Sequence, residues 1–173
     1  MKPLFTLGLS LLLLAPLGCA RTLYNFGTIE PGKVYRSAQP SPLFLRWLVR
    51  NTEVRTLVNL RGRTRGFESQ FAAENRLRLY SFDLSASRPP TQEDVDRFLA
   101  ILDDPANHPV LVHCRNGVDR TGYMLALYRI QRQRWTPEQA LAEMRRFLQF
   151  ETLNPVPASV VSEGARSVPD SVR

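Results

Sequence analysis

The sequence predicts one α/β domain with a mostly parallel central sheet of four to five strands flanked by helices. Its 173 residues suffice for a single buried core. Its 43% hydrophobic and 23% charged residues exclude a disordered, collagen-like or multi-spanning membrane chain. Short β-rich runs alternate with helical patterns, and this alternation favours parallel strands covered by helices.

The N-terminal segment is predicted to be a targeting signal. Lys2 precedes the apolar run Leu4–Leu17, which is shorter than the roughly 20 residues that cross a bilayer but matches a secretory signal. The run ends in Leu17-Gly18-Cys19-Ala20, which resembles a bacterial lipobox, so we expect cleavage before Cys19 and lipidation of its sulfur. An ordinary cleaved signal and an uncleaved anchor are the alternatives. The expected protein is an exported lipoprotein, anchored by its lipid to a membrane of the cell envelope.

Composition divides the chain into four segments. A signal peptide is predicted over residues 1–18, and a lipidated N-terminus and polar tether over 19–32. The folded domain is expected over 33–150. Residues 151–173 contain prolines and serines and little apolar periodicity, which predicts a flexible tail.

Strands and helices are predicted in a regular order within the folded domain. Strands are expected where β-branched and aromatic residues cluster, at 33–36, 54–60, 77–82 and 110–113. Helices are expected at 42–50, 67–76, 91–102, 121–132 and 137–148. Capping chemistry defines two helix starts, because Thr91 precedes Asp94 by three positions and Thr136 precedes Gln139 by three.

The chain contains two cysteines, Cys19 and Cys114, too few for a disulfide-rich scaffold or a four-thiolate zinc site. Cys114 follows a predicted strand, in the string His113-Cys114-Arg115-Asn116-Gly117-Val118-Asp119-Arg120-Thr121-Gly122. A strand, a glycine-containing loop and a helix N-terminus together form a cradle for an anion. The helix dipole and nearby arginines would stabilise a thiolate, which is the nucleophilic form of cysteine. Arg120 is spaced to hold two oxygens of a phosphoryl group in fork geometry.

This string resembles the signature of the cysteine-dependent protein tyrosine and dual-specificity phosphatases: His, Cys, five residues, Arg, then Thr-Gly. The resemblance extends over about residues 30–150, because segments 34–40 and 58–62 are similar to small bacterial dual-specificity-like phosphatases. It implies a phosphate-binding loop between the last strand and a helix, with neither metal nor organic cofactor.

The resemblance also implies a role for each residue of the signature. Cys114 would attack phosphorus to give a thiophosphate intermediate, and Arg120 would bind the phosphoryl oxygens. His113 would orient the loop, and the Thr121 hydroxyl would help the sulfur to leave. The backbone amides of the loop would line the cradle and bind substrate, at Arg115, Asn116, Gly117 and Val118.

The general acid has two candidates. Asp83 lies 31 positions before Cys114 at the end of a predicted strand, where the resembled family places its acid. Asp119 lies inside the loop, in a Gly-x-Asp-Arg-Thr string that also resembles myotubularin-type phosphoinositide phosphatases, in which that aspartate is the proposed acid. A role for neither is the third alternative.

The expected partner is a phosphorylated substrate, either a phosphoprotein or an inositol phosphate. Arg61, Arg63 and Arg65 form a basic stretch after a predicted strand, on the sheet edge where ligands usually bind. This stretch is either a contact for polyphosphorylated substrates or an ordinary solvated loop. No run interleaves basic with aromatic residues, so nucleic-acid binding is not expected despite the net charge of +7. The domain is expected to be a monomer. A catalytically inactive phosphoryl-binding module and a rhodanese-like sulfurtransferase are the alternative functions.

Overall fold

A computed structural model describes residues 23–85 and 88–147 of the chain. Cys19, the predicted signal and the predicted tail lie outside these residues. Five strands form one sheet, in the order β1-β2-β5-β3-β4. They are β1 (Gly27–Glu30), β2 (Val34–Ser37), β3 (Thr56–Asn59), β4 (Arg78–Ser81) and β5 (Val110–His113). All the strands except β1 are parallel, which confirms the predicted fold class.

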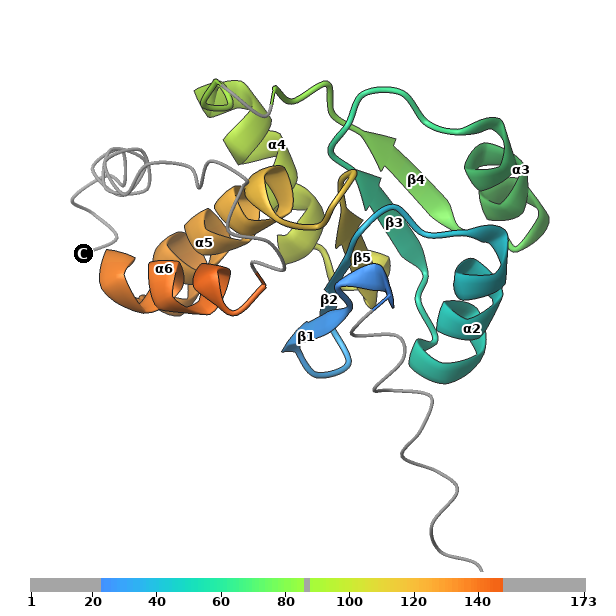
Figure 1. Cartoon of the computed structure of the whole chain (residues 1–173), viewed down its shortest axis with the longest axis horizontal. Helices are drawn as coiled ribbons and strands as arrows, with labels where there is room; N and C mark the ends of the chain where they lie inside the picture. The colour runs from blue at the N-terminus through green and yellow to red at the C-terminus, as the bar shows by residue number, and fades with distance from the viewer. Residues whose placement is uncertain (1–22, 86–87, 148–173) are drawn as a thin grey trace, which may run out of the picture.

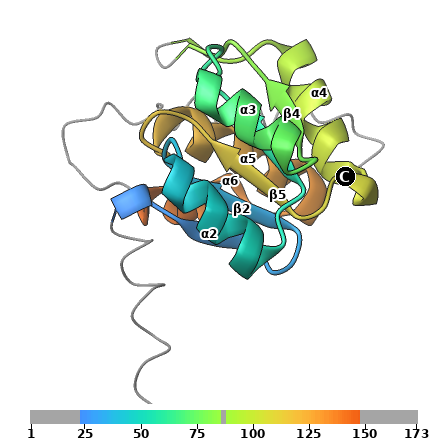
Figure 2. The ribbon, with the colours of Figure 1, turned by 90° about the vertical axis from the view of Figure 1, so that its right-hand side faces the viewer.

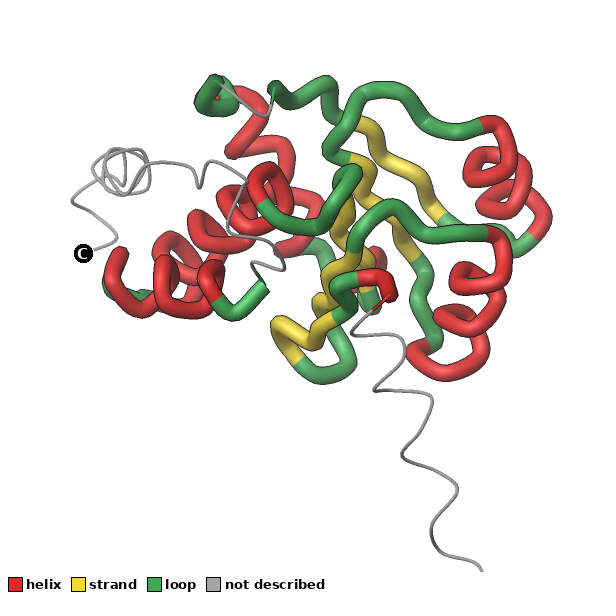
Figure 3. The backbone as a smooth tube through the Cα atoms, in the orientation of Figure 1, coloured by secondary structure: helices red, strands yellow, loops and turns green. Residues whose placement is uncertain are grey.

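Helices cover both faces of this sheet (Figures 1 and 3). They are α2 (Pro42–Thr52), α3 (Gly66–Glu74), α4 (Gln92–Asp103), α5 (Asp119–Gln133) and α6 (Pro137–Arg145), with a short 3-10 turn at Pro105–Asn107. The helices α4, α5 and α6 lie on one face, and α2 and α3 lie on the other, where Figure 2 shows them in front of the strands.

The alternation of side chains along β5 assigns residues to these two layers. Val110 and Val112 pack in the core beneath α4, α5 and α6, whereas Leu111 packs in the core beneath α2 and α3. All three are fully buried, as expected for the central strand of a parallel sheet. The strand that precedes Cys114 is therefore fixed from both sides.

Helix starts agree with the capping chemistry of the sequence. The Thr91 hydroxyl accepts from the Asp94 amide at the start of α4, and the Thr136 hydroxyl accepts from the Gln139 amide at the start of α6. Both form complete capping boxes. The predicted helices and the four predicted strands are found with their ends shifted by a few residues, and α6 ends at Arg145.

The N-terminal boundary of the fold differs from the prediction. Residues 27–30, expected within the tether, instead form β1, which pairs with β2 so that Gly27 lies opposite Arg36. A four-residue run beside Pro31-Gly32 has little strand character alone. It becomes a strand because its backbone pairs with β2. Phe26 and Ile29 are buried, so this segment belongs to the core.

Candidate active site

The carboxyl ends of the parallel strands bring the predicted signature to one edge of the sheet. Ser37 at the end of β2 and Asn59 at the end of β3 both lie beside His113 at the end of β5. Cys114 follows immediately, and α5 begins at Asp119 after the connecting loop of residues 115–118. The predicted order of strand, loop and helix is therefore present.

The Cys114 sulfur lies inside the loop. It is 2% exposed, and its Sγ accepts a hydrogen bond from the Gly117 amide at 3.2 Å. Gly117 has φ of +67°, and an added Cβ would lie 2.6 Å from the backbone of Ser37 and Ala38. Both the backbone conformation and the space therefore require glycine at this point.

The first turn of α5 presents polar groups that have no partner within the described part of the chain. These buried atoms are Oδ1 of Asp119, Nε of Arg120 and Oγ1 of Thr121. Buried polar atoms are normally hydrogen-bonded, so a cluster of unpaired ones beside a loop needs an explanation. A phosphoryl group in the loop would supply acceptors for the guanidinium and the hydroxyl.

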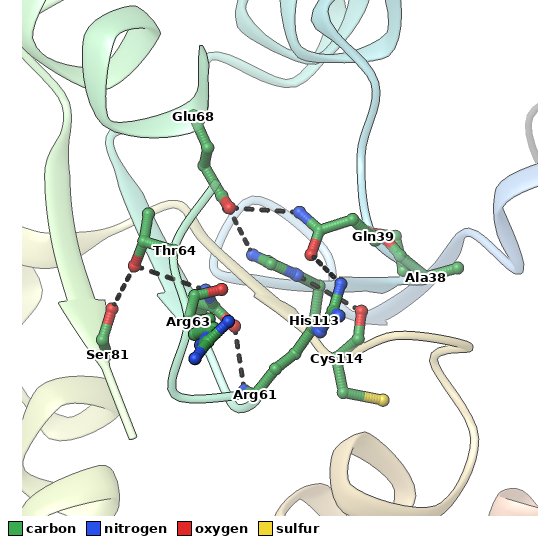
Figure 4. A network of polar contacts seen from close by, with 11 residues as sticks. Ala38, Gln39, Arg61, Arg63, Thr64, Glu68, Ser81, His113 and Cys114 are labelled. Atoms are coloured by element: carbon green, nitrogen blue, oxygen red, sulfur yellow. Dashed lines mark hydrogen bonds and ion pairs between the residues drawn. The ribbon is translucent and has the colours of Figure 1, made fainter. Parts of the chain in front are cut away.

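A polar network that the sequence did not predict supports the loop from the α3 side (Figure 4). Nε2 of His113 lies 2.6 Å from Oε1 of Glu68, and both side chains are fully buried. The second imidazole nitrogen, Nδ1, lies 3.4 Å from the Cys114 carbonyl oxygen. His113 therefore links Glu68 to the backbone of the cysteine.

This network extends from Glu68 to the surface. Gln39 donates to Oε2 of Glu68 at 3.1 Å, and Arg61 donates to Oε1 of Gln39 at 3.2 Å. Burial raises the pKa of Glu68. The hydrogen bond and charge of His113, together with hydrogen bonds from Gln39 and the Arg65 backbone, lower that pKa more, so the net shift is downward. Glu68 carries no sequence signal, because an acidic residue in the first turn of a helix is usually a solvated dipole partner.

The two candidate acids lie on different elements, Asp83 after β4 and Asp119 at the start of α5. Asp83 is exposed and follows β4, and its backbone forms an isolated antiparallel bridge with Arg61. The next residue, Leu84, accepts from Nη1 of Arg120 at 3.4 Å, which brings the Asp83 segment to the arginine of the signature. Asp119 is half-buried, and burial raises its pKa.

The remaining predicted residues occupy different environments. Within the loop, Arg115 and Asn116 are exposed, whereas Val118 is buried. Arg63 and Arg65 are exposed on the segment between β3 and α3, and Arg61 is held by Gln39. Within residues 23–85 and 88–147, no group of three or more His, Cys, Asp or Glu side chains is arranged to hold a metal ion.

The family was identified by comparison with a family model described as "DSP-PTPase phosphatase fused to NAD+ Kinase", which matches residues 27–156. The chain belongs to this DSP-PTPase phosphatase family. It is 32% identical over 127 residues to inositol diphosphatase DSP3 of Arabidopsis thaliana, covering 70% of this chain and 61% of DSP3. It is 30% identical over 113 residues to the dual specificity protein phosphatase TpbA of Pseudomonas aeruginosa, covering 65% of this chain and 50% of TpbA. The DSP-PTPase chain thus spans less than two thirds of the length of these curated relatives.

Solved structures of DSP-PTPase relatives share the same architecture. The catalytic core of the PP-IP phosphatase Siw14 of Saccharomyces cerevisiae, in complex with citrate, has a TM-score of 0.71 at 25% identity, covering 80% of this chain and 83% of that one. TpbA of P. aeruginosa has a TM-score of 0.63 at 29% identity, covering 87% and 89% of the two chains. The family signature therefore lies in the fold that its relatives use.

Proposed function

We propose that this chain is a phosphomonoesterase that hydrolyses phosphate esters through a thiophosphate on Cys114. The observation that carries the proposal is the hydrogen bond from the Gly117 amide to the Cys114 sulfur, inside a loop beside the unpaired Nε of Arg120. The amide donor gives the sulfur a fixed position in the loop, and the arginine has a nitrogen without a partner among the described residues to offer to an anionic group.

The first chemical step transfers the phosphoryl group to sulfur. The thiolate of Cys114 attacks phosphorus, the P–S bond forms and the ester P–O bond breaks, while Arg120 binds the non-bridging oxygens. The leaving oxygen takes a proton from a carboxylic acid. We propose Asp83 for this role, because it is exposed and adjoins the residue that contacts Arg120, whereas Oδ1 of Asp119 is enclosed.

The second step returns the enzyme to its starting state. Water attacks the thiophosphate, the P–S bond breaks and inorganic phosphate leaves. The carboxylate formed in the first step takes the proton from that water. The unpaired hydroxyl of Thr121 is suited to donate to the sulfur as negative charge returns to it.

The proposed substrates are phosphotyrosine, phosphoserine and phosphothreonine proteins or inositol phosphates. The relatives support both classes, since DSP3 is an inositol diphosphatase and TpbA a dual specificity protein phosphatase. The segment that contains Arg61 and the exposed Arg63 and Arg65 follows β3, whose end lies beside the end of β5 that leads into the Cys114 loop. Arginines at this sheet edge favour substrates with further phosphates. Neither an inactive binding module nor a sulfurtransferase explains the intact Cys114 and Arg120 pair equally well.

Hydrolysis of an aryl phosphate by the protein under reducing conditions tests the proposed activity. We expect turnover that vanadate blocks and that Cys114→Ser abolishes. Trapping of a phosphorylated protein, detected by mass spectrometry after rapid acid quench, should place the phosphate on Cys114. Activity that persists in folded Cys114→Ser would contradict the mechanism.

We further propose that the protein is exported and lipidated at Cys19. The proposal is supported by the apolar run Leu4–Leu17 and the following Leu17-Gly18-Cys19-Ala20 string. Of the residues that the structure describes, none forms a helix long and apolar enough to cross a membrane. Labelled palmitate should be incorporated by the wild-type chain in a bacterial host and not by Cys19→Ala, and label retained by Cys19→Ala would overturn the assignment.

We propose that the protein acts as a monomer, because its nucleophile, arginine and candidate acids all come from one chain. Light scattering coupled to size exclusion should give the mass of one chain at concentrations that support full activity. A stable dimer with higher specific activity would contradict this proposal.

A further inference from the structure

A second arginine reaches the nucleophile loop from the sheet. Arg36 lies on β2, which pairs directly with β5 (Figure 1), and its side chain is 1% exposed. Its Nη2 donates to the Gly117 carbonyl oxygen, so it contacts the residue whose amide donates to the Cys114 sulfur.

The aromatic ring of Phe147 packs against the Arg36 guanidinium, whose central carbon lies 3.8 Å from the ring centroid. The ring can approach because Gly27, opposite Arg36 on β1, has no side chain. An added Cβ at Gly27 would lie 2.4 Å from a carbon of that ring. The guanidinium is therefore fixed between the loop and the ring.

Asn25 fixes the same part of the loop from the N-terminal segment. Its side-chain amide lies 3.2 Å from the carbonyl oxygen of Asn116, 3.1 Å from that of Gly117 and 3.0 Å from that of Phe147. The Gly117 carbonyl thus faces two donors, the side chains of Asn25 and Arg36. The backbone of Ser37 and Ala38 fills the space beside the Cα of Gly117. These contacts leave Gly117 little freedom to turn its amide away from the sulfur.

The charge of Arg36 is unusual for such a buried position. Burial lowers its pKa to about 10, while charge on Cys114 and on Glu143 raises that pKa. The guanidinium is therefore protonated at neutral pH, and a buried cation is costly unless an anion lies near it. Glu143 also forms an ion pair with Arg129, at 2.5 Å, so its negative charge is divided between Arg36 and Arg129.

We propose that Arg36 is a positioning residue for Cys114, which holds the Gly117 amide toward the sulfur and stabilises the thiolate from the β2 side. This inference rests on the proposed phosphatase function, because it assigns Arg36 a role in preparing the nucleophile of that reaction. The described contacts of Arg36 are with Gly117 and Phe147, whereas the proposed substrate contact is made by Arg120 from α5. The loop is thus held between two arginines with different tasks.

Other charged and titratable groups also face the loop. Glu68 acts from α3 through His113, Asp119 and Arg120 lie on α5, and Glu143 lies on α6 near Arg36. Asp83 and Arg61 approach from the β3 and β4 side. None of these groups is itself changed in an Arg36 variant, so a shift of the alkylation midpoint is compared against an unchanged set of neighbouring side chains.

The test measures the pH dependence of Cys114 alkylation by iodoacetamide in the full-length protein. Modified Cys114 peptide is quantified by mass spectrometry, which separates it from Cys19. Arg36→Met removes both charge and donor, Arg36→Gln keeps a donor without charge, and Arg36→Lys keeps the charge. We expect the midpoint of alkylation to rise by about one pH unit in Arg36→Met and Arg36→Gln, and to stay near wild type in Arg36→Lys.

Arg129→Met is the matched control. Arg129 is also buried, its guanidinium lies 4.2 Å from the Trp135 ring centroid, and it donates to the Ile29 carbonyl, but it does not contact the loop. This variant should lose thermal stability. It also frees Glu143 near Arg36, so the alkylation midpoint should move much less than in Arg36→Met. If Arg36→Met does not fold, Arg36→Gln and Arg36→Lys decide the question. An unchanged midpoint in folded Arg36→Met or Arg36→Gln would overturn the proposal.

The same experiment separates this inference from the proposed function. Alkylation reports on the sulfur whether or not the protein hydrolyses phosphate esters. Wild-type protein without vanadate-sensitive turnover would refute the function, whereas active wild type with an Arg36-independent midpoint would refute only the role of Arg36.

Discussion

Nε2 of His113 lies 2.6 Å from Oε1 of Glu68, with both side chains fully buried. This contact joins the strand that carries the nucleophile to helix α3, and it continues through Nδ1 of His113 to the Cys114 carbonyl. The histidine of the signature is therefore held in one orientation by a carboxylate from a separate element. A loop that depends on this contact should lose both stability and activity when the carboxylate is changed.

Glu68→Gln should destabilise the fold by roughly 3 kcal/mol at pH 7, because it removes one partner of a buried polar pair. Urea denaturation measures this difference, and kcat for an aryl phosphate should fall in the same variant. Glu74→Gln is the control on the same helix, since Glu74 is exposed and its carboxylate accepts a hydrogen bond from Gln70 at the surface. A loss of similar size in Glu74→Gln would mean that the effect is not specific to the pair.

The stability difference between wild type and Glu68→Gln should depend on pH. The net pKa of Glu68 is lowered in the fold, so its carboxylate stabilises the native state at pH values above its ordinary unfolded value of about 4.3. The stabilisation should disappear as pH falls through the lower pKa of the folded state. Urea denaturation at several pH values between neutral and strongly acidic measures the change, and a constant difference across that range would contradict the assignment.

The pH profiles of Asp83→Asn and Asp119→Asn should identify the general acid. The acid must be protonated in the first step, so kcat/KM in the wild type should fall as pH rises through its pKa. We expect this fall to disappear in Asp83→Asn, together with a loss of rate of about 100-fold or more. Loss of the fall in Asp119→Asn alone would assign the role to Asp119, and its retention in both variants would exclude both residues.

Stability gives an independent test of the environment of Asp119. Burial raises its pKa, so its charged form is less favourable in the folded state than in the unfolded state. Asp119→Asn should therefore keep or slightly raise Tm at pH 7. The difference should shrink as pH falls through the raised pKa of the folded state and vanish below about 4. A marked fall in Tm at pH 7 would instead show that the carboxylate makes favourable contacts.

Gly62→Ala should disturb the Asp83 segment. Gly62 has φ of +79°, and an added Cβ would lie 2.2 Å from Oδ1 of Asp83. We expect a loss of stability of about 1–2 kcal/mol from the backbone conformation, and a lower kcat because the carboxylate is displaced. Gly66→Ala is the control, because an added Cβ there meets nothing within 4 Å and its φ is not positive. Equal kcat in the two variants would show that Asp83 does not depend on Gly62.

The exposed arginines between β3 and α3 should affect substrate choice. Arg63→Ala and Arg65→Ala together should reduce kcat/KM for a polyphosphorylated inositol by about 10-fold or more, while a simple aryl phosphate is turned over normally. Arg50→Ala, an exposed arginine on α2, controls for the general loss of positive charge. An equal effect on both substrates would exclude a role in recognising additional phosphates.

Much of the fold and the core of the site could be predicted from local patterns. The strand before Cys114, the glycine in the loop and the arginine at the sixth position lie within residues 110–120, so their spacing alone indicates a cradle. The capping boxes of α4 and α6 are equally local, since each involves residues three positions apart. The strand β1 was missed because its four residues gain strand character only by pairing with β2.

The nucleophile, its arginine and the α/β class can be predicted from local residue order, because each depends on a single strand, loop and helix unit. Which distant groups support that unit depends on how the chain packs. Asn25 contacts Asn116 across 91 positions and Arg36 contacts Gly117 across 81, and only the pairing of β2 with β5 brings Arg36 and the loop together. Glu68 likewise becomes a partner of His113 only when α3 packs on the sheet. Burial turns these polar side chains, ordinary in the linear sequence, into the hydrogen-bonding and charged surroundings of Cys114.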